Sequence, residues 1–165
     1  ATADDRGHGF AIDTTQTRPE SRGSLSLASA DPRSAPLIDP NYLAEEKDRV
    51  MMRDGLKMLR ELCAQPSLAA LCGEELRPGR GVTTDAQLDE VVRNTADSIY
   101  HPVGTARMGT DDMSVVDPAT MAVHGTQGLF VADASVMPQL VSGNTNAASI
   151  MIGANGSDLI LDQIK

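Results

Sequence analysis

Apolar residues recur at helical spacing in two segments of the first 100 residues. The first predicted helix has one apolar face formed by Met52, Leu56, Leu59 and Cys63. Asp39-Pro40 lies ahead of it as an N-cap followed by a first-turn proline. We expect the charged residues of this segment to form a solvated face, which comprises Glu45, Lys47, Arg49, Arg53 and Arg60.

Two further helices are predicted closer to the C-terminus. Thr84 and Gln87 have the spacing of a capping box and open a helix of about 84–98. The last helix covers about 145–164, where Gly153 and Gly156 permit the close approach of another backbone. Its N-terminus follows Ser142-Gly143-Asn144-Thr145-Asn146 with no acidic neighbour. We therefore expect free amides there that suit an anion or a carbonyl group.

Short strands are predicted around these helices. Leucine alternates with serine in residues 23–27, which indicates one strand between extended linkers. Residues 121–124 and 129–132 are expected to form two more, joined through Gly125 and Gly128. The elements together predict a mixed α/β (α+β) fold.

Charge is distributed unevenly over the 165 residues. The net charge of −9 and the scarcity of aromatic residues disfavour binding to phosphate backbones and base stacking, so nucleic acid is not expected as a partner. Residues 113–165 hold only five of the 37 charged side chains. A segment with so few charges would leave apolar surface exposed. We therefore expect it to be buried by a partner chain, a missing domain or a large cofactor.

Several functional classes lack their sequence signals. Residues 1–13 are too polar for a signal peptide, and the uncharged stretch 134–157 is too polar for a membrane span. The sequence does not fix the compartment, although it favours the cytoplasm. Cys63 and Cys72 lack a CxxC pattern and are expected to be two buried thiols. The spacing of His8, His101 and His124 matches no metal site.

Nucleotide-binding and hydrolase motifs are incomplete. Gly104 and Gly109 have phosphate-loop spacing, but Thr110-Asp111 stands where Lys-Ser/Thr is required. Gly7-x-Gly9 and Gly79-x-Gly81 lack the third glycine of a dinucleotide fingerprint. No Gly-x-Ser-x-Gly nucleophile elbow occurs.

Four ordered blocks carry the remaining chemistry. They are YHPVGTARMG at 100–109, VVDP at 115–118, GLFVADASVMP at 128–138 and SGNTN at 142–146. Together they resemble the C-terminal signature of the glucose–methanol–choline (GMC) flavin oxidoreductases, in the branch of the alcohol and choline oxidases and dehydrogenases. The resemblance is dense over 100–165 and fainter over 18–63.

The resemblance implies specific roles for seven residues. His101 matches the active-site base, and Asn144 matches the second active-site position. Asp133 and Ala134 match the contact with the flavin diphosphate and ribityl region. Three further residues would lie near the flavin ring: Thr145 and Asn146 at the pyrimidine carbonyls, and Tyr100 as a nearby aromatic. Ala106 replaces a cysteine that many relatives have, which we do not expect to alter the chemistry.

The resemblance also implies a domain organisation in a longer flavoprotein. Residues 1–17 would be an extended start or linker, 18–112 part of the substrate-binding domain, and 113–165 the C-terminal part of a Rossmann-like FAD domain. Family members grip the ADP part of FAD with a Gly-x-Gly-x-x-Gly turn, which this sequence lacks. The expected partner is therefore the N-terminal FAD-binding polypeptide of the same protein.

The implied activity is FAD-dependent oxidation of a small primary or secondary alcohol to an aldehyde or ketone. An imidazole, with an ordinary pKa of about 6.5, can take the hydroxyl proton at neutral pH while an amide orients the oxygen. A non-catalytic fragment or subunit that needs a partner chain and a lyase on the same scaffold are the alternatives. The sequence specifies neither the alcohol nor whether dioxygen or a quinone-like compound accepts the electrons.

Overall fold

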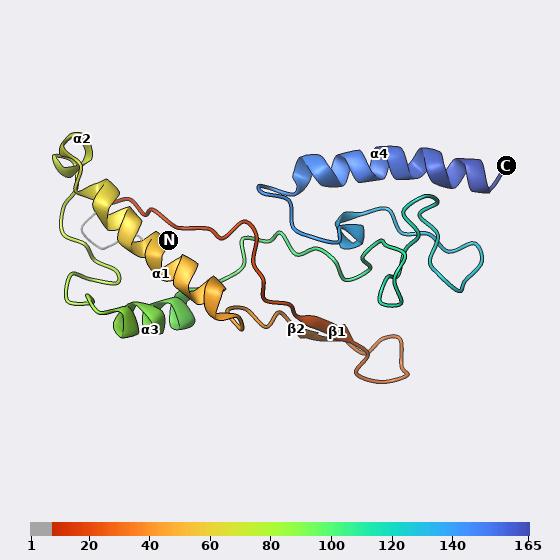
Figure 1. The fold of residues 1–165 in the computed structure, drawn as a ribbon, viewed down its shortest axis with the longest axis horizontal. Helices are drawn as coiled ribbons and strands as arrows, with labels where there is room; N and C mark the ends of the chain where they lie inside the picture. Colours follow the sequence, from red (N-terminus) through yellow and green to blue (C-terminus); the bar gives the residue numbers. More distant parts are fainter. Residues whose placement is uncertain (1–7) are drawn as a thin grey trace. The chain divides into compact units, whose positions relative to one another are not determined.

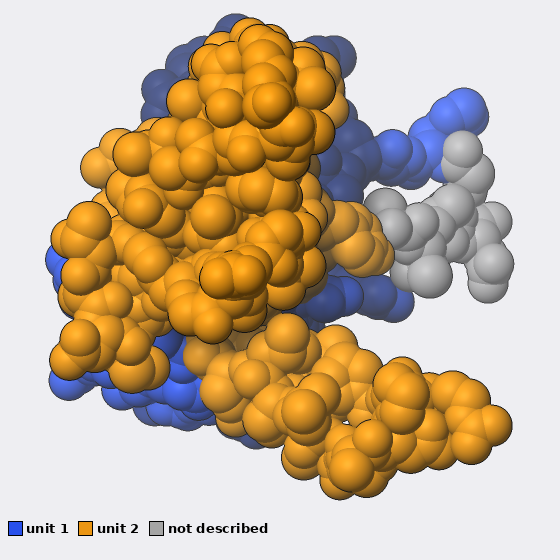
Figure 2. All heavy atoms as spheres, turned by 90° about the vertical axis from the view of Figure 1, so that its right-hand side faces the viewer, with its two compact units in different colours: residues 1–16, 20–22, 41–97 blue, residues 17–19, 23–40, 98–165 orange. Residues whose placement is uncertain are grey.

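The computed structural model describes residues 8–165, so part of the polar start and Gly7 lie outside the described residues. The chain divides into two compact units (Figures 1 and 2). Among the described residues, unit 1 comprises 8–16, 20–22 and 41–97, and unit 2 comprises 17–19, 23–40 and 98–165. The units separate at 97/98, whereas the domain boundary expected from the sequence lies at 112/113. That domain assignment stays a prediction.

Unit 1 is built on three helices, α1 (Glu46–Cys63), α2 (Pro66–Ala69) and α3 (Asp85–Thr95). Leu88 and Val92 of α3 are buried, and α3 packs against α1. The predicted start of α1 at Asp39-Pro40 is wrong. Asp39 ends a strand, and positive φ angles at Asn41 and Leu43 prevent a helix between Pro40 and Glu45.

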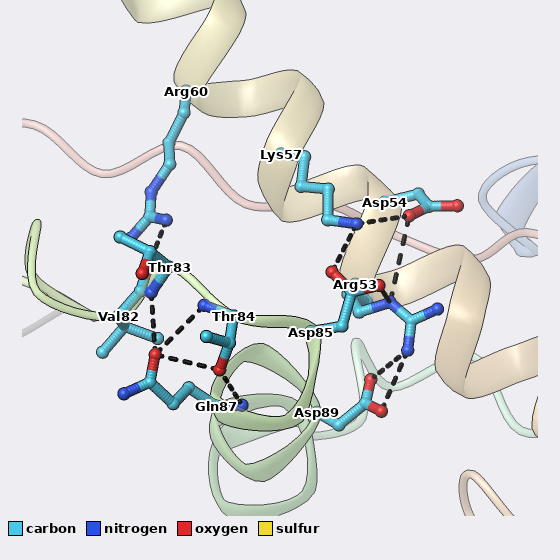
Figure 3. A network of polar contacts seen from close by, with 10 residues as sticks. All are labelled: Arg53, Asp54, Lys57, Arg60, Val82, Thr83, Thr84, Asp85, Gln87 and Asp89. Atoms are coloured by element: carbon cyan, nitrogen blue, oxygen red, sulfur yellow. Dashed lines mark hydrogen bonds and ion pairs between the residues drawn. The ribbon is translucent and has the colours of Figure 1, made fainter.

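The expectation of a solvated charged face on α1 is wrong for Arg53. Arg53 is 17% exposed and its Nη1 donates to both carboxylate oxygens of Asp89 at 3.0 and 2.9 Å (Figure 3). Lys57 Nζ lies 2.7 Å from Asp85 Oδ1 and 3.4 Å from Asp54 Oδ1. The cause is tertiary, since α3 presents the carboxylates of Asp85 and Asp89 to this side of α1.

The side chains of Arg49 and Arg60 also bind protein groups, in contrast to the solvated face expected from the sequence. Arg60 forms an ion pair with Glu75 at 2.8 Å and donates to the carbonyl oxygens of Val82 and Gly79. Arg49 donates to the carbonyl oxygen of Leu43 at 2.6 Å. These cations close the loops around α1.

The predicted capping box at the start of α3 is confirmed. Thr84 Oγ1 accepts a hydrogen bond from the Gln87 N–H at 3.3 Å, and Gln87 Oε1 accepts one from the Thr84 N–H at 3.0 Å (Figure 3). The helix ends at Thr95, three residues before the expected end. Cys63 and Cys72 are free thiols that are only half-buried, in contrast to the full burial expected. Desolvation and the neighbouring Cys63 thiol raise the pKa of Cys72.

Asp48 is the buried polar centre of unit 1. Its side chain is 1% exposed and accepts hydrogen bonds from the backbone N–H groups of Glu20 (2.9 Å) and Ser21 (2.7 Å). The Ser21 hydroxyl and the Gln16 amide also donate to it. Burial alone would raise the pKa of Asp48, but these donors outweigh it and lower the pKa to about 2. Sequence pattern did not distinguish Asp48 from its solvated neighbours.

Unit 2 begins with a two-stranded antiparallel sheet. β1 (Ser24–Ser26) pairs with β2 (Leu37–Asp39) with Leu25 opposite Ile38. The predicted strand at 23–27 is therefore confirmed over its centre. Its partner β2 was not predicted, because Leu37-Ile38 is too short to show a strand period.

The core of unit 2 lies against α4 (Asn146–Gln163), the last helix in Figure 1. It consists of Val116, Met121, Val136, Met137 and Ile152. A Cβ at Gly156 would lie 2.8 Å from the Ala132 side chain, so the close approach expected at this glycine is present, whereas the space at Gly153 is open.

The two strands predicted at 121–124 and 129–132 are absent as regular elements. Only isolated antiparallel bridges remain in this region, Val116 with Val123 and Ala122 with Phe130. Positive φ angles at Met121, Gly125 and Gly128 interrupt the extended backbone. Within residues 8–165 no helix has both the length and the apolar character needed to cross a membrane.

Candidate active site

Two of the four sequence blocks lie side by side in unit 2. The Ala106 N–H donates to the Ser135 carbonyl oxygen at 3.1 Å, and the Met108 N–H donates to the Val136 carbonyl oxygen at 2.8 Å. Gly104 has a φ of 87°, and a Cβ there would lie 3.3 Å from the Met137 carbonyl oxygen. The backbone therefore fixes the segment that follows His101 against the turn that follows Asp133.

Asp133 caps this turn. Its Oδ1 accepts hydrogen bonds from the Ser135 N–H at 2.8 Å and the Ser135 hydroxyl at 2.5 Å, at the start of a short 3₁₀ helix, η1 (Ala134–Val136). A carboxylate repels a phosphate, so the Asp133 side chain itself does not fit a diphosphate. Backbone N–H groups at 133–134 are the groups of this turn that suit an anion.

The N-terminus of α4 has no side-chain cap. Thr145 occupies the N-cap position with φ −81° and ψ −8°, and its side chain makes no capping hydrogen bond. The first turn carries no acidic residue. Asn146 is exposed. The first amides of α4 are thus available, with the positive end of the helix dipole, to an electron-rich group outside the helix.

His101 is held against the turn that carries Asn144. The hydroxyl Oγ1 of Thr145 lies 2.9 Å from His101 Nδ1, and Thr145 is only 7% exposed. Among residues 8–165, no hydrogen bond engages His101 Nε2 or the exposed Asn144 side chain. One imidazole nitrogen is therefore fixed, while the other nitrogen and the side chain of Asn144, the residue before Thr145, have no hydrogen-bond partner among these residues.

A second contact fixes the same turn. Arg18 Nε donates to Ser142 Oγ at 2.5 Å, across 124 positions of the sequence. Neither this contact nor the bond between Thr145 and His101 was found from sequence. The residues are too far apart along the chain for local spacing to pair them. Only the joint presence of the 100–109 and 142–146 blocks hinted that the segments meet.

Tyr100 and the other histidine of this unit lie outside this arrangement. Tyr100 is 86% exposed and has a φ of 63°, so its ring is not packed into the core of this unit. His124 Nε2 lies 3.0 Å from the Gly109 carbonyl oxygen, where it closes a loop. No group of His, Cys, Asp or Glu in the described part of the chain could hold a metal ion.

Comparison with known proteins shows to which family the chain is similar. A sequence profile of the GMC oxidoreductases matches residues 19–153. The chain is 46% identical over 156 residues to an oxygen-dependent choline dehydrogenase of Escherichia coli, covering 94% of this chain and 28% of that protein. It is 44% identical over 158 residues to an alcohol dehydrogenase [acceptor] of Pseudomonas putida, covering 96% and 28%. The chain therefore spans about 28% of the length of these relatives.

A solved structure supports the same relationship. An FAD-dependent oxidoreductase from Chaetomium thermophilum aligns with a TM-score of 0.82 and 32% sequence identity. The alignment covers 89% of this chain and 26% of that one. Helices with a small two-stranded sheet thus match a part of a GMC flavoenzyme structure, which confirms the predicted mixed architecture at this level.

Proposed function

We propose that this chain, which belongs to the GMC oxidoreductase family, forms part of the active site of an FAD-dependent alcohol oxidoreductase. His101 is the base, and Asn144 is the residue that orients the substrate oxygen. The activity belongs to a longer protein, since the chain spans about 28% of its relatives. Its partner is the FAD-binding part of the same protein.

One observation carries this proposal. The 2.9 Å contact between Thr145 Oγ1 and His101 Nδ1 joins the histidine block to the asparagine turn. His101 and Thr145 are 44 positions apart in sequence, and their contact supports the proposal that the histidine block and the asparagine turn act together. A base must lie within hydrogen-bond reach of the proton that it removes, and His101 Nε2, which makes no hydrogen bond within residues 8–165, leaves that contact open to a substrate.

The proton and the oxygen are handled by residues of this chain. His101 Nε2 takes the hydroxyl proton of the alcohol, while the Asn144 amide donates a hydrogen bond to the oxygen as alkoxide character develops. An amide does not compete for the proton near neutral pH. No protein side chain accepts a hydride, and FAD supplies that chemistry when bound.

The residues present fit FAD in two places. The uncapped first turn of α4, with the exposed Asn146, suits the electron-rich pyrimidine edge of a flavin. The backbone N–H groups at Asp133 and Ala134 suit a diphosphate, with the Asp133 side chain holding the turn in shape. Thr145 contributes to the cofactor through its backbone, because its hydroxyl already contacts His101.

The proposed substrate is a small primary or secondary alcohol. Relatives named as choline and alcohol dehydrogenases support this class. A lyase on this scaffold would use His101 for proton transfer without reducing the flavin. A non-catalytic chain would bind the rest of the protein and leave the flavin unreduced as well.

Anaerobic mixing of the FAD-loaded full-length protein with choline and with simple primary and secondary alcohols tests the proposal. We expect bleaching of the flavin absorbance and one equivalent of aldehyde or ketone per flavin. If an alcohol is converted while the flavin stays oxidised, the lyase alternative replaces the proposal. If no alcohol in the set reduces the flavin and none is converted to another product, the catalytic proposal fails.

A further inference from the structure

We propose that Thr145 is a positioning residue whose hydroxyl accepts a hydrogen bond from His101 Nδ1–H and so leaves Nε2 free to act as a base. The proposal rests on the proposed function, because it assigns a role to Thr145 within that site. It identifies the Thr145 hydroxyl as the acceptor of the His101 Nδ1 proton. Thr145 is 7% exposed, so water does not readily replace this acceptor.

The Thr145 hydroxyl does not make the capping hydrogen bond that its N-cap position favours. Threonine at an N-cap usually adopts an extended backbone and accepts a hydrogen bond from an N–H of the first helical turn. Here the backbone of Thr145 is helical, with φ −81° and ψ −8°, and no capping bond forms. The hydroxyl instead lies 2.9 Å from His101 Nδ1.

The direction of this hydrogen bond follows from the role of His101. A neutral imidazole carries one proton, on either Nδ1 or Nε2. If the Thr145 hydroxyl donated to Nδ1, the proton would be on Nε2, and that nitrogen could not accept the proton of an alcohol. A base at Nε2 therefore requires an Nδ1–H that donates to Thr145 Oγ1.

This arrangement keeps the ring in place while its charge changes. In the imidazolium both nitrogens are donors, so the Nδ1–H bond to Thr145 Oγ1 persists after Nε2 has taken a proton. The ring need not rotate between the neutral and the charged form. Hydrogen bonding of the second nitrogen is a general means of fixing the tautomer of a functional histidine.

The unmutated protein provides the first test. ¹⁵N NMR of histidine-labelled full-length protein distinguishes the two neutral tautomers, and the His101→Asn spectrum assigns the His101 signals by their loss. We expect the Nδ1–H tautomer for His101 at a pH where the ring is neutral. The Nε2–H tautomer would overturn the proposal without any change at Thr145.

Variants at position 145 provide the second test. Thr145→Val keeps the shape and removes the hydroxyl, and Thr145→Ser keeps the hydroxyl. We expect Thr145→Val to populate the Nε2–H tautomer and to slow flavin reduction by about 5-fold, the factor that one net neutral hydrogen bond represents. Thr145→Ser should restore both readouts. If Thr145→Val does not fold, Thr145→Cys gives a side chain of similar size with only a weak sulfur acceptor.

The outcomes separate this proposal from the proposed function. If His101→Asn abolishes flavin reduction but Thr145→Val changes neither tautomer nor rate, the role of Thr145 is refuted and that of His101 stands. Loss of flavin from Thr145→Val with an unchanged tautomer makes Thr145 a cofactor contact, which also refutes the proposal. If His101→Asn retains normal reduction, the proposed function fails while the tautomer result still reports on Thr145.

Discussion

Replacing Asp48 by asparagine should release the segment that includes Gln16, Glu20 and Ser21 from α1. The carboxylate accepts hydrogen bonds from all three residues and is 1% exposed. Asparagine has the same shape, but it lacks the charge and presents an NH₂ group to donors. The variant therefore loses charge-assisted hydrogen bonds. Its NH₂ group would also face the backbone N–H groups of Glu20 and Ser21, which are donors as well.

The size of the effect follows from the pKa of Asp48. Its lowering from the ordinary value of 3.8 to about 2 corresponds to about 2.5 kcal/mol, at about 1.36 kcal/mol per pH unit. This is an upper value, because Glu20, which covers the carboxylate, is itself exposed. Since the pKa is lower in the folded state, the stabilisation is complete above about pH 5 and is lost as the pH falls towards 2. At pH 3 about 1.3 kcal/mol should remain.

Urea unfolding at pH 7 and pH 3, with hydrogen exchange of the Glu20 and Ser21 amides, measures the effect. Glu46→Gln is the matched control, because it removes an exposed acid from the same first turn of α1. We expect Asp48→Asn to be less stable than Glu46→Gln at pH 7, with a smaller gap at pH 3. Equal stability of the two variants at pH 7, or a gap that does not shrink in acid, would refute the reasoning.

Two further predictions concern the proposed site. The isolated 165-residue chain should bind no FAD, because it supplies only part of the cofactor contacts, and stoichiometric flavin after purification would contradict this. Asn144→Ala should slow flavin reduction by roughly 10–150-fold, the loss of a hydrogen bond to a developing charge worth about 1.5–3 kcal/mol, with flavin content unchanged. Asn144→His should retain measurable activity in rapid-mixing assays, and loss of flavin rather than of rate in Asn144→Ala would make this turn a cofactor clamp.

Local pattern was sufficient for the elements whose signals are local. The capping box at Thr84 and Gln87 depends on residues three positions apart, and it is present as expected. The apolar spacing likewise predicted the C-terminal ends of α1 and α4 to within a few residues. These helices end at Cys63 and Gln163. The start of α1 was missed, since positive φ at Asn41 and Leu43 leaves no clear sequence signal.

Tertiary contacts account for what the sequence could not predict. Arg53 belongs to a charged run, and the packing of α3 gives it ion pairs with Asp85 and Asp89 and leaves it 17% exposed. Asp48 is buried by donors from a segment about 28 positions away. For the proposed site, the motifs predicted roles for His101 and Asn144, but the contact between Thr145 and His101 joins residues 44 positions apart and could be found only from the fold.

The central claim is that His101 removes the hydroxyl proton, and the pH dependence of flavin reduction in the full-length FAD-loaded protein tests it most directly. Stopped-flow reduction by a substrate alcohol is measured for the unmutated protein, for His101→Ala and for the control His124→Ala, whose ring only closes a loop at Gly109. We expect His101→Ala to keep its flavin, to be slowed by about 10²–10⁴-fold and to recover partly at high pH, where more of the alcohol is ionised. His124→Ala should behave like the unmutated protein. A rate for His101→Ala within a few-fold of the unmutated rate across this pH range would contradict the account.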